Sequence, residues 1–143
     1  MANGDYVKFY NFVEALLNGV HGDMEASGAL KVYLTNNTPD QALDLLKADL
    51  VGLTEGAGYG YDPASVTATV GETTGTATVG ATDVTWTCTA GGTIGPFRYV
   101  VLYNDTATDD PLIAYWDYGS SITLNPGESF TVNFTDDKLF TLA

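Results

Sequence analysis

The chain has few of the side chains on which metal binding and nucleophilic catalysis most often depend. Its 143 residues include one cysteine, Cys88, and one histidine, His21. A lone cysteine excludes an intrachain disulfide, and two such ligands are too few for a structural zinc site. No serine or cysteine stands in a Gly-x-Ser-x-Gly pattern. The sequence therefore predicts that the protein is not an enzyme, and it predicts no cofactor and no metal site.

Basic residues are also scarce. Five lysines and arginines stand against 18 aspartates and glutamates, which gives a formal net charge of −13. Such a charge repels phosphate backbones and anionic lipid headgroups, so we expect neither nucleic acid nor membrane as a partner. The same repulsion between copies keeps a protein soluble at high local concentration.

Long apolar runs are absent as well. No run approaches the roughly 20 residues that a membrane-spanning helix requires. The first residues, Met1 to Asp5, lack the basic region and apolar stretch of a secretory signal. We therefore expect a soluble protein that is made in the cytoplasm.

What the chain does contain is enough apolar material for one folded unit. Hydrophobic residues make up 45% of the composition, which is sufficient to offset the entropy lost on ordering. The length suits one domain, residues 1–143. Within it, the sequence predicts an N-terminal helical arm over residues 1–28 and a β-rich core over residues 29–143.

The arm is predicted to be a helix from Tyr6 to Asn18. Asp5 is the expected N-cap, and the residues that recur at helical spacing until Gly19 are Phe9, Phe12, Val13 and Leu16. The favoured interpretation is a helix packed on its own domain, and the alternative is an arm that docks on a neighbouring subunit. For that alternative the candidate contact residues are Tyr6, Phe9, Tyr10 and Phe12.

A second short helix is predicted after Thr38. Pro39 follows this threonine and Gln41 stands three residues beyond it, which is the pattern of a capping box with proline at the first helical position. We expect this helix to continue through Leu46.

The rest of the chain alternates apolar and polar residues with a period of two, as β-strands do. The repeat of Ala68–Gly71 at Ala77–Gly80 predicts a hairpin, and Asn125–Gly127 predicts a turn. The remaining predicted strands are Ala29–Thr35, Val84–Thr89, Phe97–Tyr103 (central in its sheet), Leu112–Tyr118, Ser129–Thr135 and an edge strand Leu139–Leu142. The predicted fold class is mainly β: an antiparallel β-sandwich or jelly-roll-like domain with the two short helices.

Four aspartates are the best candidates for acid–base chemistry: Asp105, Asp109, Asp110 and Asp117. A facing pair of them would suit glycoside hydrolysis. The favoured interpretation is turn chemistry, because aspartate side chains bond to nearby backbone amides. Asp136 and Asp137 are candidates for binding an adventitious ion and nothing more.

Aromatic residues offer a second candidate site, for carbohydrate stacking. They are Tyr59, Tyr61, Tyr115, Trp116 and Tyr118. Alternation in the strand Leu112–Tyr118 puts Leu112, Ala114, Trp116 and Tyr118 on one face, which is typical of a core, and we favour that interpretation.

Single polar residues receive structural interpretations. His21 is expected to be a solvated loop residue, and Cys88 a small buried residue on the same face as Trp86. Arg98 has two interpretations, an internal ion pair or a contact with a partner, and the internal pair is favoured.

The block Gly95–Thr106, which continues through Pro111–Ser121, resembles a block of small virion proteins of tailed bacteriophages. The stretch Ile122–Phe134 is similar to their usual ending, and the resemblance spans roughly Ala29 to Leu142. The predicted helix Tyr6–Asn18 departs from the shorter members.

This resemblance implies a capsid decoration, or cement, protein. Its expected partners are the major capsid protein lattice and further copies of itself, as a dimer or trimer. Its expected location is the capsid exterior of the virion, after synthesis in the bacterial host cytoplasm. The alternative is a tail-associated carbohydrate- or receptor-binding module.

Overall fold

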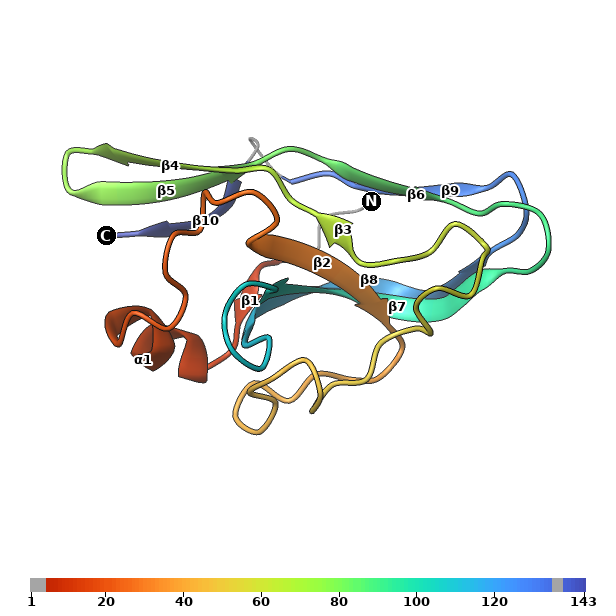
Figure 1. Ribbon diagram of the computed structural model, residues 1–143, viewed down its shortest axis with the longest axis horizontal. Coiled ribbons are helices and arrows are strands. Elements are labelled where there is room, and N and C mark those ends of the chain that lie inside the picture. Colours follow the sequence, from red (N-terminus) through yellow and green to blue (C-terminus); the bar gives the residue numbers. More distant parts are fainter. Residues whose placement is uncertain (1–4, 135–137) are drawn as a thin grey trace.

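The computed structural model describes residues 5–134 and 138–143, and they form an antiparallel β protein with one short helix (Figure 1). The fold class predicted from the sequence, mainly β and sandwich-like, is confirmed. In chain order the elements are β1 (Val7–Lys8), α1 (Asn11–Leu17), β2 (Leu30–Thr35), β3 (Ala64–Ser65), β4 (Ala68–Thr73), β5 (Thr76–Ala81), β6 (Val84–Thr87), β7 (Ile94–Asn104), β8 (Leu112–Leu124), β9 (Ser129–Val132) and β10 (Lys138–Leu142).

One layer is a five-stranded sheet with the order β1-β8-β7-β2-β3. Its centre is β7, which pairs antiparallel with β8 on one side and β2 on the other. The nearly unbroken apolar run of β7 predicts such a position, because a strand buried on both faces has no solvent-facing polar positions. The prediction of a central strand is therefore confirmed.

The second layer consists of a three-stranded sheet, β10-β5-β4, and a two-stranded sheet, β6-β9. Both lie over one face of the five-stranded sheet (Figure 1). The main core fills the space between the layers, where for example the rings of Phe97 on β7 and Phe130 on β9 meet edge to face with centroids 4.9 Å apart. This apolar burial is the principal stabilising term of such a fold.

The opposite face of the five-stranded sheet carries a second, smaller core. It is formed by Phe9, Tyr33, Leu50, Val101, Tyr103 and Leu112. The long β2–β3 connection covers this face, and the hydroxyl of Tyr33 donates to the carbonyl of Leu50 at 2.7 Å. A loop thus takes the place that a third layer would occupy.

The N-terminal segment differs from the predicted helix Tyr6–Asn18. Val7 and Lys8 pair with Tyr115 and Ala114 of β8, so the chain is extended there, and α1 begins only at Asn11. Asp5 is not the N-cap, because Tyr10 holds that position without a side-chain cap. Pairing with a distant strand outweighs the local helical pattern. Residues from the predicted arm over 1–28 therefore belong to the sheet and its cores.

The helix predicted after Thr38 is wrong; the chain makes a single turn there. Asp40, rather than Thr38, accepts from the amides of Ala42 and Leu43, at 2.9 and 3.1 Å. The side chain of Gln41 donates to the carbonyl of Lys8 at 2.8 Å instead of closing a capping box. Further helix is prevented because the next residues bond to the β7–β8 turn, where the amide of Leu112 donates to the carbonyl of Leu45 at 3.0 Å.

The other predicted strands are present with shifted ends, and the largest difference is β8, which continues beyond its predicted end at Tyr118 to Leu124. The hairpin is β4–β5, and its turn residues Thr74 and Gly75 both have positive φ, as a type I′ turn requires. The strand predicted as Ser129–Thr135 ends at Val132, because the amide of Phe134 bonds to the side chain of Asp83 at 3.1 Å; Thr135 lies outside the described residues.

Strand alternation predicted that Leu112, Ala114, Trp116 and Tyr118 share one face of β8, and this prediction is wrong at Leu112. A register shift between Leu102 and Tyr103 of β7 places Leu112 in the smaller core, whereas Ala114 and Trp116 lie in the main core. The predicted turn Asn125–Gly127 and the predicted edge strand at the C-terminal end, here β10, are confirmed.

Gly60 provides a stability test of the contact between the β2–β3 connection and β6. Its φ is +87°, and a Cβ there would overlap the backbone carbonyl oxygen of Thr87. We expect Gly60→Ala to lower the free energy of unfolding by about 3 kcal/mol, through backbone strain and overlap together. Urea denaturation measures this change in the free energy of unfolding.

Gly58→Ala is the matched control. Gly58 has nearly the same φ, +84°, but a Cβ there meets nothing within 4 Å. Only strain remains, and the expected loss is about 1 kcal/mol. Equal losses for the two variants would show that Gly60 does not pack against Thr87.

Candidate functional site

The four residues predicted as protein contacts divide between the interior and the surface. Phe9 and Phe12 are 0% and 1% exposed and belong to the two cores. Tyr6 packs on Trp116 and Phe140 with both ring centroids at 5.8 Å, and burial raises the pKa of its hydroxyl. Of the four, only Tyr10, at 62% exposure, presents a large aromatic surface to solvent.

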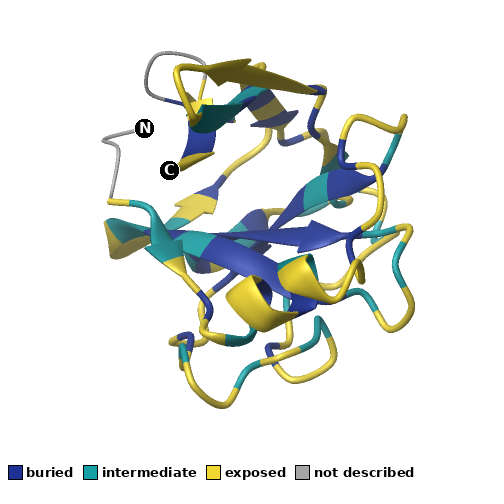
Figure 2. Cartoon of the chain, turned by 90° about the vertical axis from the view of Figure 1, so that its left-hand side faces the viewer, coloured by how far each residue is buried: buried dark blue, intermediate teal, exposed yellow. Residues whose placement is uncertain are grey.

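Tyr10, at the start of α1, belongs to an apolar strip on the solvent side of this helix. Figure 2 shows this side of the helix coloured as exposed. Positions 10, 13 and 17 follow the spacing that aligns side chains along one side of a helix. Val13 is 39% exposed and Leu17 is 83% exposed. The opposite side of the helix packs into the domain through Phe12 and Ala15. The helix is therefore apolar on two sides, and only one is covered.

Two further exposed residues extend this strip. Val20, 45% exposed, follows the helix, and its amide donates to the carbonyl of Ala15 at 2.9 Å. Leu43, 74% exposed, lies in the turn that is tied to the helix start by a 3.0 Å hydrogen bond from the amide of Tyr10 to the carbonyl of Gln41. We call Tyr10, Val13, Leu17, Val20 and Leu43 the α1 outer face. Of the nine large hydrophobic residues that are exposed in the described part of the chain, five lie in this face.

The sequence interpretation missed most of this face. It assigned Val13 to the side that packs inward, and it placed Leu43 in a helix that does not form. The spacing of Tyr10, Val13 and Leu17 is itself visible in the sequence. What the sequence did not show is that the helix begins only at Asn11: Phe9 follows β1 and bonds to Ile113 of β8, and Val13 lies on the solvent side.

The four aspartates considered for catalysis do not form a facing pair of free carboxylates. Asp117 accepts two hydrogen bonds from the guanidinium of Arg98, at 2.7 and 2.8 Å, and these lower the pKa of Asp117. Asp105 lies 2.6 Å from Nζ of Lys31 and accepts from the hydroxyl of Tyr103; although burial opposes it, these bonds lower the pKa of Asp105. The favoured internal ion pair of Arg98 is confirmed.

Asp109 and Asp110 form the tight turn between β7 and β8. Both have positive φ, 65° and 51°, which is uncommon for residues other than glycine. Burial, and then the negative charge of Asp105, raises the pKa of Asp110. These two residues lie in a turn, as predicted, but through their backbone conformation. The predicted bond from a backbone amide to the aspartate side chain is found instead at Asp117, which accepts from the amide of Gly119 at 2.7 Å. Asp136 and Asp137, named above for an adventitious ion, lie outside the described residues.

The aromatic residues considered for carbohydrate stacking belong largely to the core. Trp116 and Tyr61 are 6% and 4% exposed, and the remaining three are half-buried. The indole nitrogen of Trp86 donates to the carbonyl of Asp62 at 2.8 Å, which holds the segment around Tyr61 against Trp86. Trp116 and Tyr61 therefore present no open ring to a sugar, and the core interpretation is confirmed for them.

His21 is not the solvated loop residue that its glycine-rich surroundings predict. It is 2% exposed, and its ring packs edge to face on Phe12 at 5.2 Å. The side-chain amide of Asn104 donates to the carbonyl of His21 at 2.8 Å and lies 3.3 Å from its Nδ1. Nε2 is buried without a partner. A buried partner 83 residues away in sequence overrides the local signal.

Cys88 is buried, as predicted, in the same core as Trp86. Within the described ranges no three histidine, cysteine or acidic side chains come together as metal ligands would. The same residues contain no helix with the length and hydropathy needed to cross a bilayer.

The state of His21 predicts a pH dependence of stability. Burial lowers the pKa of its imidazole, and its ring neighbours Phe12 and Asn104 are uncharged. The unfolded chain then binds a proton at higher pH than the folded chain, so stability is full above about pH 6.5 and is lost as pH falls toward the folded-state pKa.

As His21 is the only histidine, its ring protons give one NMR titration curve. We expect a midpoint below 6.5, and a free energy of unfolding that falls between pH 7.5 and 5.5. His21→Phe removes the titrating group, so its unfolding free energy should change less over this interval. A midpoint at or above 6.5 would contradict the burial argument.

Comparisons of the chain with protein-family models, with curated proteins and with solved structures find no match.

Proposed function

We propose that this chain is a structural protein of tailed-phage virions that binds the outer surface of the capsid lattice as a decoration protein and stabilises the shell. The sequence block that resembles such proteins, Gly95–Ser121 with Ile122–Phe134, corresponds to β7, β8 and β9. These strands form the middle of one layer and part of the other. The resemblance therefore supports a shared framework, and the contact surface must be sought outside it.

The α1 outer face is the observation that carries the proposal. Apolar side chains such as Leu17, 83% exposed, lose contact with water only when another surface covers them. The helix α1 and the turn at Leu43, which a hydrogen bond joins, together present these apolar side chains to solvent. Such a surface suits a protein partner and offers no hydrogen-bonding side chains, apart from the Tyr10 hydroxyl, to a polar small molecule.

The charge of the chain is compatible with this role. At −13, copies repel one another in solution, so dense coverage requires a favourable contact for every copy. Contacts of several copies with one lattice, or of a dimer or trimer with neighbouring capsid subunits, add through avidity. A copy that bridges two subunits raises the free energy needed to separate them.

Binding to capsids is the first test. The purified protein is mixed, over a concentration series, with heads of the phage that encodes it after the protein has been stripped from them, and the heads are sedimented. We expect saturation at one fixed ratio to the major capsid protein, and heads that survive heating better when loaded. An absence of binding at any concentration would reject decoration and direct the search to the tail.

The contact surface is tested with Leu17→Asp. Because Leu17 is almost fully exposed, the substitution should change the free energy of unfolding by less than about 0.5 kcal/mol. Loss of a buried leucine at the contact should weaken head binding by roughly 10- to 100-fold.

Val70→Asp serves as the matched control. Val70 is 46% exposed on the edge strand β4, outside the α1 outer face, and the substitution adds the same charge. It should bind heads like the unmodified protein. If Leu17→Asp also binds unchanged, the contact lies on another face.

A further inference from the structure

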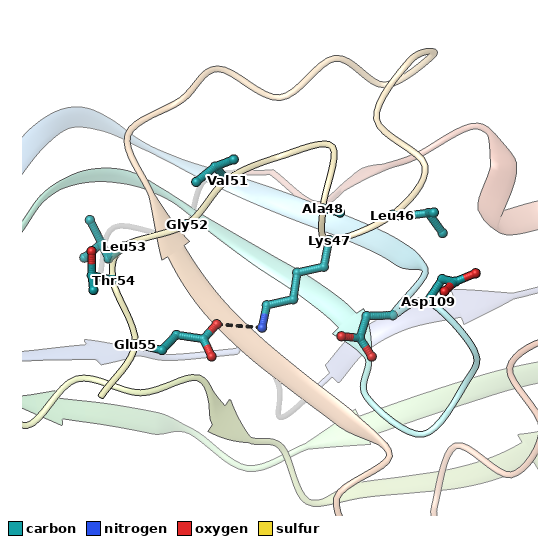
Figure 3. A pocket seen from close by; sticks show the side chains of 10 residues that line it. Leu46, Lys47, Ala48, Val51, Gly52, Leu53, Thr54, Glu55 and Asp109 are labelled. Carbon is teal, nitrogen blue, oxygen red and sulfur yellow. Dashed lines mark hydrogen bonds and ion pairs between the residues drawn. The ribbon is translucent and has the colours of Figure 1, made fainter. Parts of the chain in front are cut away.

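A groove that begins three residues after Leu43 along the chain carries features that the α1 outer face lacks. It has a volume of about 590 Å³ and lies between segment 46–55 of the β2–β3 connection and the turn Asp109–Asp110 (Figure 3). Aliphatic side chains of Leu46, Val51 and Leu53 line it together with carboxylates. We call it the acidic groove.

Both walls of the acidic groove are fixed by backbone hydrogen bonds. The amide of Lys47 donates to the carbonyl of Asp110 at 3.0 Å, which joins the two walls. The amide of Leu53 donates to the carbonyl of Leu34 at 2.9 Å, and the hydroxyl of Thr35 donates to the carbonyl of Val51 at 2.7 Å. The groove is therefore formed before any ligand arrives, which reduces the entropic cost of binding.

The charges in the groove do not balance. Glu55, Asp109 and Asp110 contribute three carboxylates, against the one ammonium of Lys47. Lys47 is already engaged: its Nζ lies 2.6 Å from Glu55 and 4.8 Å from the ring centroid of Tyr103. Its side chain points to Glu55 in Figure 3. Within residues 5–134 and 138–143, neither Asp109 nor Asp110 forms an ion pair.

The aliphatic wall is open to solvent at its rim. Val51 is 65% exposed, and Leu45, which precedes the lining segment, is 40% exposed. A ligand that enters the groove therefore meets apolar surface on one side and, on the other, two carboxylates that form no ion pair within the described residues. This combination matches a side chain with a cationic end beside an apolar one.

We propose that the acidic groove binds a segment of a partner protein in which an arginine or lysine follows an aliphatic residue. The cationic group faces Asp109 and Asp110, and the aliphatic side chain packs on Val51 and Leu53. A second copy of this chain fits less well. Three of its five basic residues form ion pairs within the described residues, and Val7–Lys8, an aliphatic residue followed by lysine, is held in β1 against β8. This proposal does not depend on the capsid role.

Charge complementarity is the argument for this occupant. The whole chain carries −13, so a basic segment is attracted at long range and is then held by the carboxylates of Asp109 and Asp110, which form no ion pair within the described residues. A metal ion fits less well, because the described residues contain no group of three ligands placed for one. A neutral apolar ligand would leave the two carboxylates without a partner.

The test uses a defined probe, the dipeptide N-acetyl-leucyl-arginine amide, added to the ¹⁵N-labelled protein at low ionic strength. Amide shifts should move in segment 46–55 and at Asp109 and Asp110, with saturation in the millimolar range expected of so small a ligand. N-acetyl-leucyl-glutamine amide, which lacks the charge, and N-acetyl-alanyl-arginine amide, which lacks the aliphatic chain, should each bind at least about threefold more weakly.

The variant Asp109→Asn with Asp110→Asn removes both charges while keeping the turn, because asparagine also tolerates positive φ. It should bind the leucyl-arginine probe about 5- to 10-fold more weakly. Asp5→Asn with Glu14→Gln is the control: both residues are exposed, both lie outside the groove, and the net charge changes equally.

The control should keep the affinity of the unmodified protein. Equal weakening in the two double variants would show that only overall charge attracts the probe, and it would overturn the proposal. So would shifts confined to other parts of the chain, or no shifts at all. Because no phage heads are involved, the result is independent of whether the protein decorates capsids.

Discussion

The structure depends on the burial of β7 on both of its faces. A strand with apolar side chains on alternate sides requires two covers, and this chain supplies them by different means. The second layer of strands covers one face, around Phe97 and Val100, and the β2–β3 connection covers the other, around Val101 and Tyr103. The loop is thus a structural part of the fold, and its shape is constrained by the hydrogen bond from the hydroxyl of Tyr33 on β2 to the carbonyl of Leu50 within the loop. The acidic groove lies at the edge of this cover.

The few basic residues are used close to the central sheet. Lys31 pairs with Asp105, Lys47 with Glu55, and Arg98 with Asp117. All three pairs are partly exposed, so water screens them and each adds little to stability. Their larger effect is on the surface potential: they occupy most of the positive charge, so the outer surface stays strongly negative. Both proposed contacts are consistent with this, since one relies on apolar area and the other on a cation from the partner.

The strands could be predicted from the sequence because their signals are local. Alternation in β9, the apolar run of β7 and the repeat in the β4–β5 hairpin each lie within one segment. The errors occur where a residue far away in the sequence determines the local structure. The helix predicted from Tyr6 gives way to β1 because β8 pairs there, and His21 is buried because Asn104 reaches it. The acidic groove was not predictable for the same reason, since its walls lie more than 50 residues apart in sequence. The α1 outer face could be predicted only with the correct start of the helix, at Asn11.

The pairing of β1 with β8 also has a consequence for biosynthesis. Val7 leaves the ribosome before Tyr115, its partner, has been polymerised. At about 5 to 20 residues per second, the intervening chain of roughly 100 residues takes on the order of 5 to 20 s to make. During that time Phe9 and Phe12 lack the strands that bury them in the finished domain. The nascent N-terminal segment is therefore a natural site for a chaperone to act, and the domain closes only when the second half of the chain has emerged.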